Sequence, residues 1–129
     1  MTKKKILIVE DDQDMRRALN VRLRANNYET AFASDAIEAL SIAKKEQPDL
    51  VLLDLGLPAG DGFRVMDRMK DIPSLSCLPV IVVSARDPAG NKDRALSAGA
   101  AAFFQKPVDN GQLMAAIRLS LGEAIEFGQ

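Results

Sequence analysis

Apolar and polar positions follow two different periods along this chain, and these periods predict alternating strands and helices. The apolar runs at residues 6–9, 50–53 and 80–83 are continuous, which is typical of strands buried on both faces of a sheet. Less apolar runs at residues 28–33 and 101–104 predict two further strands.

The segments between these runs repeat apolar residues every three or four positions, which predicts helices. Asp35 and Glu38 form a capping pair at the start of the second helix, and Pro48 follows its end. The helical positions are Met15, Ala18, Leu19 and Leu23; Ala36, Ala39, Leu40 and Ala43; Phe63, Met66 and Met69; the region 92–98; and Leu113, Ala116, Ile117, Leu121 and Ala124.

Five strand–helix units in 129 residues predict one α/β domain over residues 1–129. Such alternation is typical of a doubly wound parallel sheet, a (βα)5 fold with helices on both faces. No linker, repeat or low-complexity tract interrupts the alternation.

Composition excludes several functional classes. A net charge of −1 gives no indication of nucleic-acid binding, and no apolar run is long enough to span a membrane. The single cysteine, Cys77, excludes an internal disulfide and is consistent with a cytoplasmic protein, and the four apolar residues after Lys5 are too few for a signal peptide. Because the chain has no histidine, it has no histidine catalyst, no histidine metal ligand and no phosphohistidine of its own.

Polar side chains follow four of the five predicted strands. Glu10 and Asp11 follow the first strand, Asp54 the third and Ser84 the fourth, and Lys106 comes just after the fifth. Ligands of open parallel sheets bind outside the carboxyl ends of the strands, so these side chains converge if those four strands are neighbours. Three carboxylates suit a hard cation such as Mg²⁺, and a phosphoryl group suits the metal together with Lys106.

Each of these residues also has an ordinary structural interpretation. Acids at positions 10–12 could form a solvated turn or cap the next helix, and Asp54 could belong to a structural ion pair. Ser84 could bond local backbone, and Lys106 could be a surface lysine beside a turn. These ordinary interpretations explain each residue taken singly, but they do not explain why all of these residue types follow the ends of the strands together.

These residues stand in four motifs that resemble the receiver domain of two-component response regulators. The motifs are ILIVEDD, PDLVLLDLGLPAGDG, PVIVVSA and GAAAFFQKP, and the resemblance extends from residue 4 to about residue 121. It implies the strand order 2-1-3-4-5 of flavodoxin-like folds, which chemotaxis receivers share.

The resemblance also implies roles for individual residues. Asp54 is expected to be the phosphate-accepting nucleophile, and Asp11 a direct ligand of Mg²⁺. Glu10 would assist the metal through water, and the Gly56 carbonyl would be a further ligand. Asp12 matches no ligand position of the family, so we interpret it as a turn or cap residue.

Three further residues are assigned by the same resemblance. Ser84 is expected to hydrogen-bond one phosphoryl oxygen, and Lys106 to pair with another. Phe103 occupies the aromatic position that follows this hydroxyl inward when the domain switches conformation. The bond between Lys106 and Pro107 is a candidate cis peptide.

The implied function is signalling rather than metabolic catalysis, with self-catalysed phosphoryl transfer and dephosphorylation only. The phosphodonor would be a sensor histidine kinase or a histidine phosphotransfer protein, and the signal would pass to an output partner that the sequence does not identify. If the chain dimerises, the resemblance implies an interface of the fourth helix, fifth strand and fifth helix. Ser84 instead of threonine, Gly56 without a side chain and the segment 86–88 depart from the commonest family pattern.

Two other functions share parts of this pattern. A flavin carrier with the same architecture needs a phosphate-binding loop after the first strand, but here that loop is acidic. A Mg²⁺-dependent phosphohydrolase could use clustered acids, but the chain has no evident general base or second Asp-x-Asp group.

Overall fold

The computed structural model describes residues 3–123, which form five strands and five helices in strict alternation. Ala124, which we placed on the last helix, lies outside the described residues. The elements are β1 (Lys5–Val9), α1 (Gln13–Ala25), β2 (Glu29–Ala33), α2 (Ala36–Glu46), β3 (Leu50–Leu53), α3 (Gly62–Lys70), β4 (Val80–Ser84), α4 (Pro88–Ser97), β5 (Ala102–Gln105) and α5 (Asn110–Ser120).

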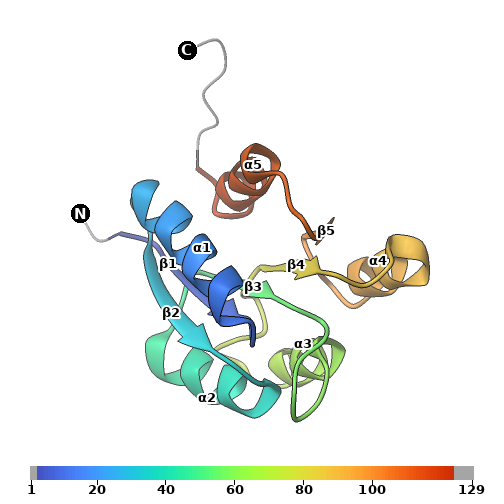
Figure 1. Cartoon of the computed structure of the whole chain (residues 1–129). Helices are drawn as coiled ribbons and strands as arrows, with labels where there is room; N and C mark the ends of the chain where they lie inside the picture. Colours follow the sequence, from blue (N-terminus) through green and yellow to red (C-terminus); the bar gives the residue numbers. More distant parts are fainter. Residues whose placement is uncertain (1–2, 124–129) are drawn as a thin grey trace.

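The strands form one parallel sheet in the order β2-β1-β3-β4-β5, which confirms the predicted doubly wound α/β fold (Figure 1). The two central pairs place Val9 opposite Leu53, and Leu53 opposite Val82. The strands β1, β3 and β4 are therefore interior, and the continuous apolar runs predicted this position correctly.

Helices cover both faces of the sheet, and each face has its own core. α1 and α5 pack on one face, where Leu19, Leu23 and Ile117 meet the even-numbered residues of β1. α2, α3 and α4 lie on the other face, where Ala39, Met66 and Ala95 belong to the second core (Figure 1). Successive side chains of a buried strand therefore pack alternately into the two cores.

An aspartate caps the N-terminus of every helix among the described residues. Each carboxylate accepts a hydrogen bond from a backbone N–H of the first helical turn, which satisfies donors that have no partner within the helix. The capping residues are Asp12, Asp35, Asp61, Asp87 and Asp109. These caps fix the position where each helix leaves the loop at the carboxyl end of a strand.

The start of α4 was predicted least well. The sequence pattern placed this helix over residues 92–98, but the structure extends it back to Pro88 through a kink. Ala89 is extended, and Gly90 has a φ of 78°, in the left-handed region that favours glycine. The fifth strand was also displaced by one residue, since β5 covers 102–105 rather than 101–104.

Gly62 has a packing role that the sequence did not reveal. Gly62 is the first residue of α3 and is buried. Its N–H donates to the Leu55 carbonyl at 2.9 Å. A Cβ atom there would lie 2.5 Å from the carbonyl oxygen of Asp54, so a larger residue would require the backbone to shift.

None of the helices among residues 3–123 has the length and apolar character needed to cross a lipid bilayer.

We predict that Gly62→Ala destabilises the fold, because its Cβ would overlap the backbone of Asp54 and Leu55. Overpacking of this kind lowers the free energy of unfolding by about 1–3 kcal/mol, which urea denaturation can measure. Gly56→Ala is the matched control, because a Cβ at Gly56 would have no atom within 4 Å. Equal stability of the two variants would contradict the close approach at Gly62.

Candidate functional site

The register of the two central strands brings the predicted acids together. Val9 pairs with Leu53, so Glu10 and Asp54 leave their strands at the same level of the sheet. The Asp54 N–H continues the ladder by donating to the Val9 carbonyl at 3.0 Å. One carboxylate oxygen from each of Glu10, Asp11 and Asp54 lies within 4.8 Å of the others.

The three acids differ sharply in exposure. Glu10 and Asp54 are 3% and 8% exposed, whereas Asp11 is exposed. Two buried carboxylates and one open carboxylate form a half-enclosed set of oxygen ligands at the mouth of the site. The donor set fits a hard divalent cation that keeps several waters, which is the usual environment of Mg²⁺ in proteins.

Asp12 has a different role from its neighbours. Its carboxylate accepts from the N–H groups of Asp14 at 2.9 Å and Met15 at 3.1 Å, so it caps α1. The prediction of a cap residue is therefore confirmed. Of the two interpretations of the acidic run, the helix cap is right for Asp12, while Glu10 and Asp11 form an acidic cluster with Asp54.

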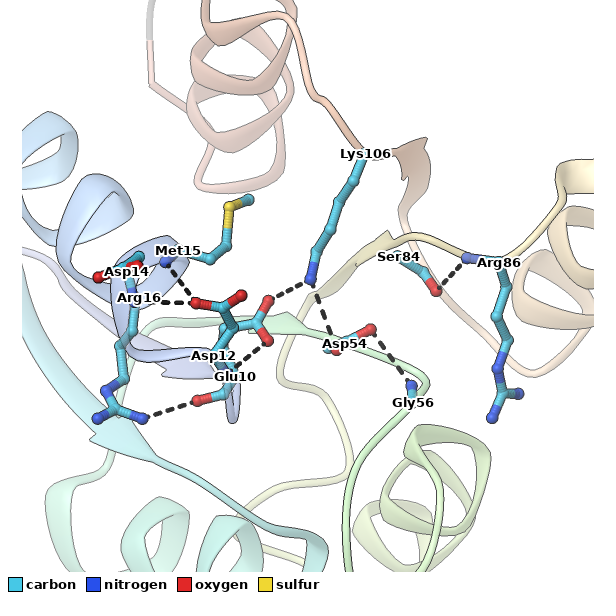
Figure 2. Close-up of polar contacts among 10 residues, drawn as sticks. All are labelled: Glu10, Asp12, Asp14, Met15, Arg16, Asp54, Gly56, Ser84, Arg86 and Lys106. Carbon is cyan, nitrogen blue, oxygen red and sulfur yellow. Dashed lines mark hydrogen bonds and ion pairs between the residues drawn. The ribbon is translucent and has the colours of Figure 1, made fainter.

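Lys106 places a positive charge among these acids. Its Nζ forms a short ion pair with Glu10 Oε1 and lies 3.6 Å from Asp54 Oδ2. Figure 2 shows the lysine reaching from the end of β5 toward both carboxylates. The default interpretation of an isolated surface lysine is wrong, because sheet order places β5 two strands away from β3 and the long side chain spans that gap.

The titration behaviour of this pair reflects burial and charge together. Burial raises the pKa of Glu10, while the hydrogen bonds from Lys106 and the Asp12 N–H oppose this shift and the Asp54 charge adds to it. Burial alone would lower the pKa of Lys106, but the hydrogen bond to Glu10 and the charges of Asp54 and Glu10 outweigh it, so the pKa is raised. Lys106 is therefore a fixed ammonium at the site.

Ser84 and Gly56 complete the surroundings of Asp54. Ser84 is fully buried, and its Oγ accepts from the Arg86 N–H at 3.1 Å, so its own proton remains available for donation. The Gly56 N–H donates to Asp54 Oδ1 at 3.2 Å. Figure 2 shows both residues around the Asp54 carboxylate, with the Arg86 side chain directed away from it.

Two further predicted features lie beside the site. Phe103 pairs with Val82 in the sheet and is half-buried against the core on the α2, α3 and α4 face. The peptide bond between Lys106 and Pro107 is cis, as predicted.

Arg16 was not predicted from the sequence to lie at the site. Its Nη1 donates to the main-chain carbonyl of Glu10 at 2.9 Å. An arginine seven residues after the end of β1 gives no signal by itself, because arginines are usually surface residues. Only the direction of α1 relative to β1 brings this guanidinium back onto the acidic bend (Figure 2).

The chain is similar in sequence to known proteins over most of its length. The sequence model of the response regulator receiver domain matches residues 6–118. The chain is 38% identical over 114 residues to the response regulator PleD of Caulobacter vibrioides, covering 88% of this chain and 25% of PleD. It is 40% identical over 116 residues to the transcriptional regulatory protein KdpE of Escherichia coli, covering 90% of this chain and 50% of KdpE.

A shorter relative is matched over nearly its whole length. The polar-differentiation response regulator DivK of Brucella anthropi is 33% identical over 121 residues, which are 94% of this chain and 98% of DivK. The chain thus spans about a quarter of PleD and half of KdpE, but almost all of DivK.

Solved structures show the same similarity. The CheY-like response regulator receiver domain protein of Methanospirillum hungatei superposes with a TM-score of 0.85 at 30% identity, covering 94% of this chain and 95% of that protein. The Francisella response regulator 1452 receiver domain, at 24% identity, supports the fold with a TM-score of 0.86 and coverage of 93% and 98%. The chain belongs to the receiver domain family of the response regulators of two-component systems.

Proposed function

We propose that Asp54 accepts a phosphoryl group from a phosphohistidine of a partner protein, with Mg²⁺ bound beside it. A sensor histidine kinase or a histidine phosphotransfer protein would supply the group, because this chain contains no histidine. The domain would then switch conformation and control an output partner. The observation that carries the proposal is the buried Asp54 carboxylate between an acidic cluster and a fixed ammonium.

Among the three acids, Asp54 is the best placed nucleophile. Both Glu10 oxygens are engaged, one with Lys106 and the other with the Asp12 N–H at 3.1 Å. Asp11 lies exposed on the bend after β1. Asp54 accepts one longer hydrogen bond from Gly56, and its neighbours supply the charge that a phosphoryl group needs.

In the transfer, a carboxylate oxygen of Asp54 would bond to phosphorus as the bond from phosphorus to the histidine nitrogen breaks. The electron pair of that bond returns to the imidazole, and the product on this chain is an acyl phosphate. The Lys106 Nζ, 3.6 Å from Asp54 Oδ2, would shift from Glu10 to a phosphoryl oxygen. The Ser84 hydroxyl would donate a hydrogen bond to another phosphoryl oxygen.

Asp11 and Asp54 would hold Mg²⁺ directly and Glu10 would assist through water, with the Gly56 carbonyl as a further ligand. When bound, the metal would neutralise charge on the phosphoryl oxygens during transfer. Because the carboxylates of Glu10 and Asp54 lie close together and mostly out of water, a cation also relieves their mutual repulsion.

The conformational switch is proposed for Ser84 and Phe103. Movement of the Ser84 hydroxyl toward a phosphoryl oxygen would leave space beside β4, and the half-buried Phe103 on the adjacent strand could turn into it. Phe103 has no hydroxyl, so it would report the switch by packing alone. Membership of the response regulator family favours this function over a flavin carrier or a phosphohydrolase.

We predict that the protein binds Mg²⁺ weakly, with a dissociation constant in roughly the millimolar range, because few protein ligands are offered. Asp11→Asn should weaken binding strongly in isothermal calorimetry, since it keeps the shape of the side chain but removes the open carboxylate. Asp14→Asn is the control, because Asp14 is an exposed acid of α1 outside the cluster. Equal affinities of wild type and Asp11→Asn would mean that the acids form only a solvated turn.

We predict that acetyl phosphate and Mg²⁺ add one phosphate to the intact mass of the protein. Hydroxylamine should remove it, because an acyl phosphate is attacked at its carbonyl carbon and a serine phosphate is not. Asp54→Asn should abolish the adduct, having the same shape without the nucleophilic charge. Asp67→Asn, at an exposed position of α3, should be modified like wild type.

The assignment of the nucleophile fails if Asp54→Asn still gains one hydroxylamine-sensitive phosphate. A hydroxylamine-resistant phosphate that disappears in Ser84→Ala would instead identify the serine as the acceptor.

A further inference from the structure

The bend after β1 is held from two opposite sides. Lys106 pairs with the Glu10 side chain on one side, and the Arg16 guanidinium donates to the Glu10 carbonyl on the other. Figure 2 shows Arg16 running back from α1 to this carbonyl, away from Lys106. Within residues 3–123, no backbone N–H donates to the Glu10 carbonyl, so Arg16 supplies its hydrogen bond.

The side chain of Asp11, the next residue, is not held by any hydrogen bond of this kind within residues 3–123. The Asp11 carboxylate is exposed and makes no hydrogen bond to the part of the chain that the structure describes. Its direction therefore depends on the backbone of residues 10–12. On the far side of Asp11, the Asp12 N–H is tied to Glu10 Oε2 and the Asp12 carboxylate caps α1.

We propose that Arg16 is a positioning residue, which fixes the bend so that Asp11 points its carboxylate into the cation site. The inference rests on the proposed binding of Mg²⁺ at Glu10, Asp11 and Asp54. A hydrogen bond from a guanidinium is charge-assisted and directional, and Arg16 is half-buried, so the contact restrains the Glu10 carbonyl. Groups that orient a ligand without touching the metal typically contribute to its affinity.

A charge effect and a positioning effect of Arg16 have opposite signs. The positive charge of Arg16 repels a divalent cation, so removing the charge alone should strengthen binding. Removing the hydrogen bond should loosen the bend and weaken binding. Arg17 separates the two effects, because it carries the same charge on the same helix but is exposed and makes no hydrogen bond or ion pair within residues 3–123.

The test is a titration of the folded, isotope-labelled protein with MgCl2, followed by the amide resonance of Gly56. This N–H donates to Asp54, so its chemical shift reports on the site itself. We expect Arg16→Met to weaken Mg²⁺ binding roughly tenfold, as outer ligand-orienting groups do. Arg17→Met should bind as tightly as wild type or slightly tighter, and Arg16→Lys should be intermediate, because an ammonium can still donate one hydrogen bond.

Ionic strength distinguishes the two effects further. Electrostatic contributions of exposed charges fade in high salt, whereas the loss caused by a misplaced Asp11 should persist. If Arg16 only stabilised the fold, Arg16→Met would have a lower thermal stability than wild type, but its folded fraction would bind Mg²⁺ with unchanged affinity. That result would contradict the positioning role.

The possible results separate this inference from the proposed function. If wild type shows no Mg²⁺-dependent shift of Gly56, the proposed metal site is wrong. If wild type binds and Arg16→Met binds as tightly as Arg17→Met, the positioning role of Arg16 is wrong. Should Arg16→Met fail to fold, wild-type affinity in Arg16→Lys and Arg16→Gln would equally overturn it.

Discussion

Repulsion between carboxylates at the carboxyl edge of the sheet is the constraint around which this structure is organised. Glu10 and Asp54 end neighbouring strands and lie mostly out of water, where like charges repel strongly. Lys106 offsets this repulsion from a third strand, and its ammonium reaches both carboxylates. The site is thus a balance of charges supplied by separate elements, and adding a dianionic group or a divalent cation changes that balance.

The fold provides this balance without bringing the charged residues close in sequence. Parallel strands all end at one edge, so a residue that follows β1 and one that follows β5 become neighbours through sheet order alone. The two cores on opposite faces hold the strands in place, and aspartate caps define where each helix departs. The rigid interior strands therefore fix the positions of the site residues, while the reactive side chains themselves lie on the loops that follow the strands.

Much of this could be predicted from sequence, because continuous apolar runs, helical spacing and acids after strands are local signals. The alternation followed from them, whereas the strand order, and with it the convergence of Asp54 with Asp11, followed from the family resemblance. The preference of Lys106 for Glu10, the Arg16 contact and the need for glycine at position 62 could not be predicted. Each depends on side-chain reach or backbone proximity between segments whose relative placement only the tertiary structure defines.

The contact of Gly62 with the backbone of Asp54 also divides the β3–α3 connection into two parts. Leu55 and Leu57 are buried and the Gly62 N–H donates to the Leu55 carbonyl, so both ends of the connection are fixed to the core. Pro58 and Ala59 between them are exposed, although the Pro58 carbonyl accepts from the Ala36 N–H at 3.2 Å. Insertions at this tip lengthen a surface loop at a small entropic cost, whereas insertions next to Gly62 displace α3. Residue 59 is therefore the position in this connection where a longer loop would disturb the core least.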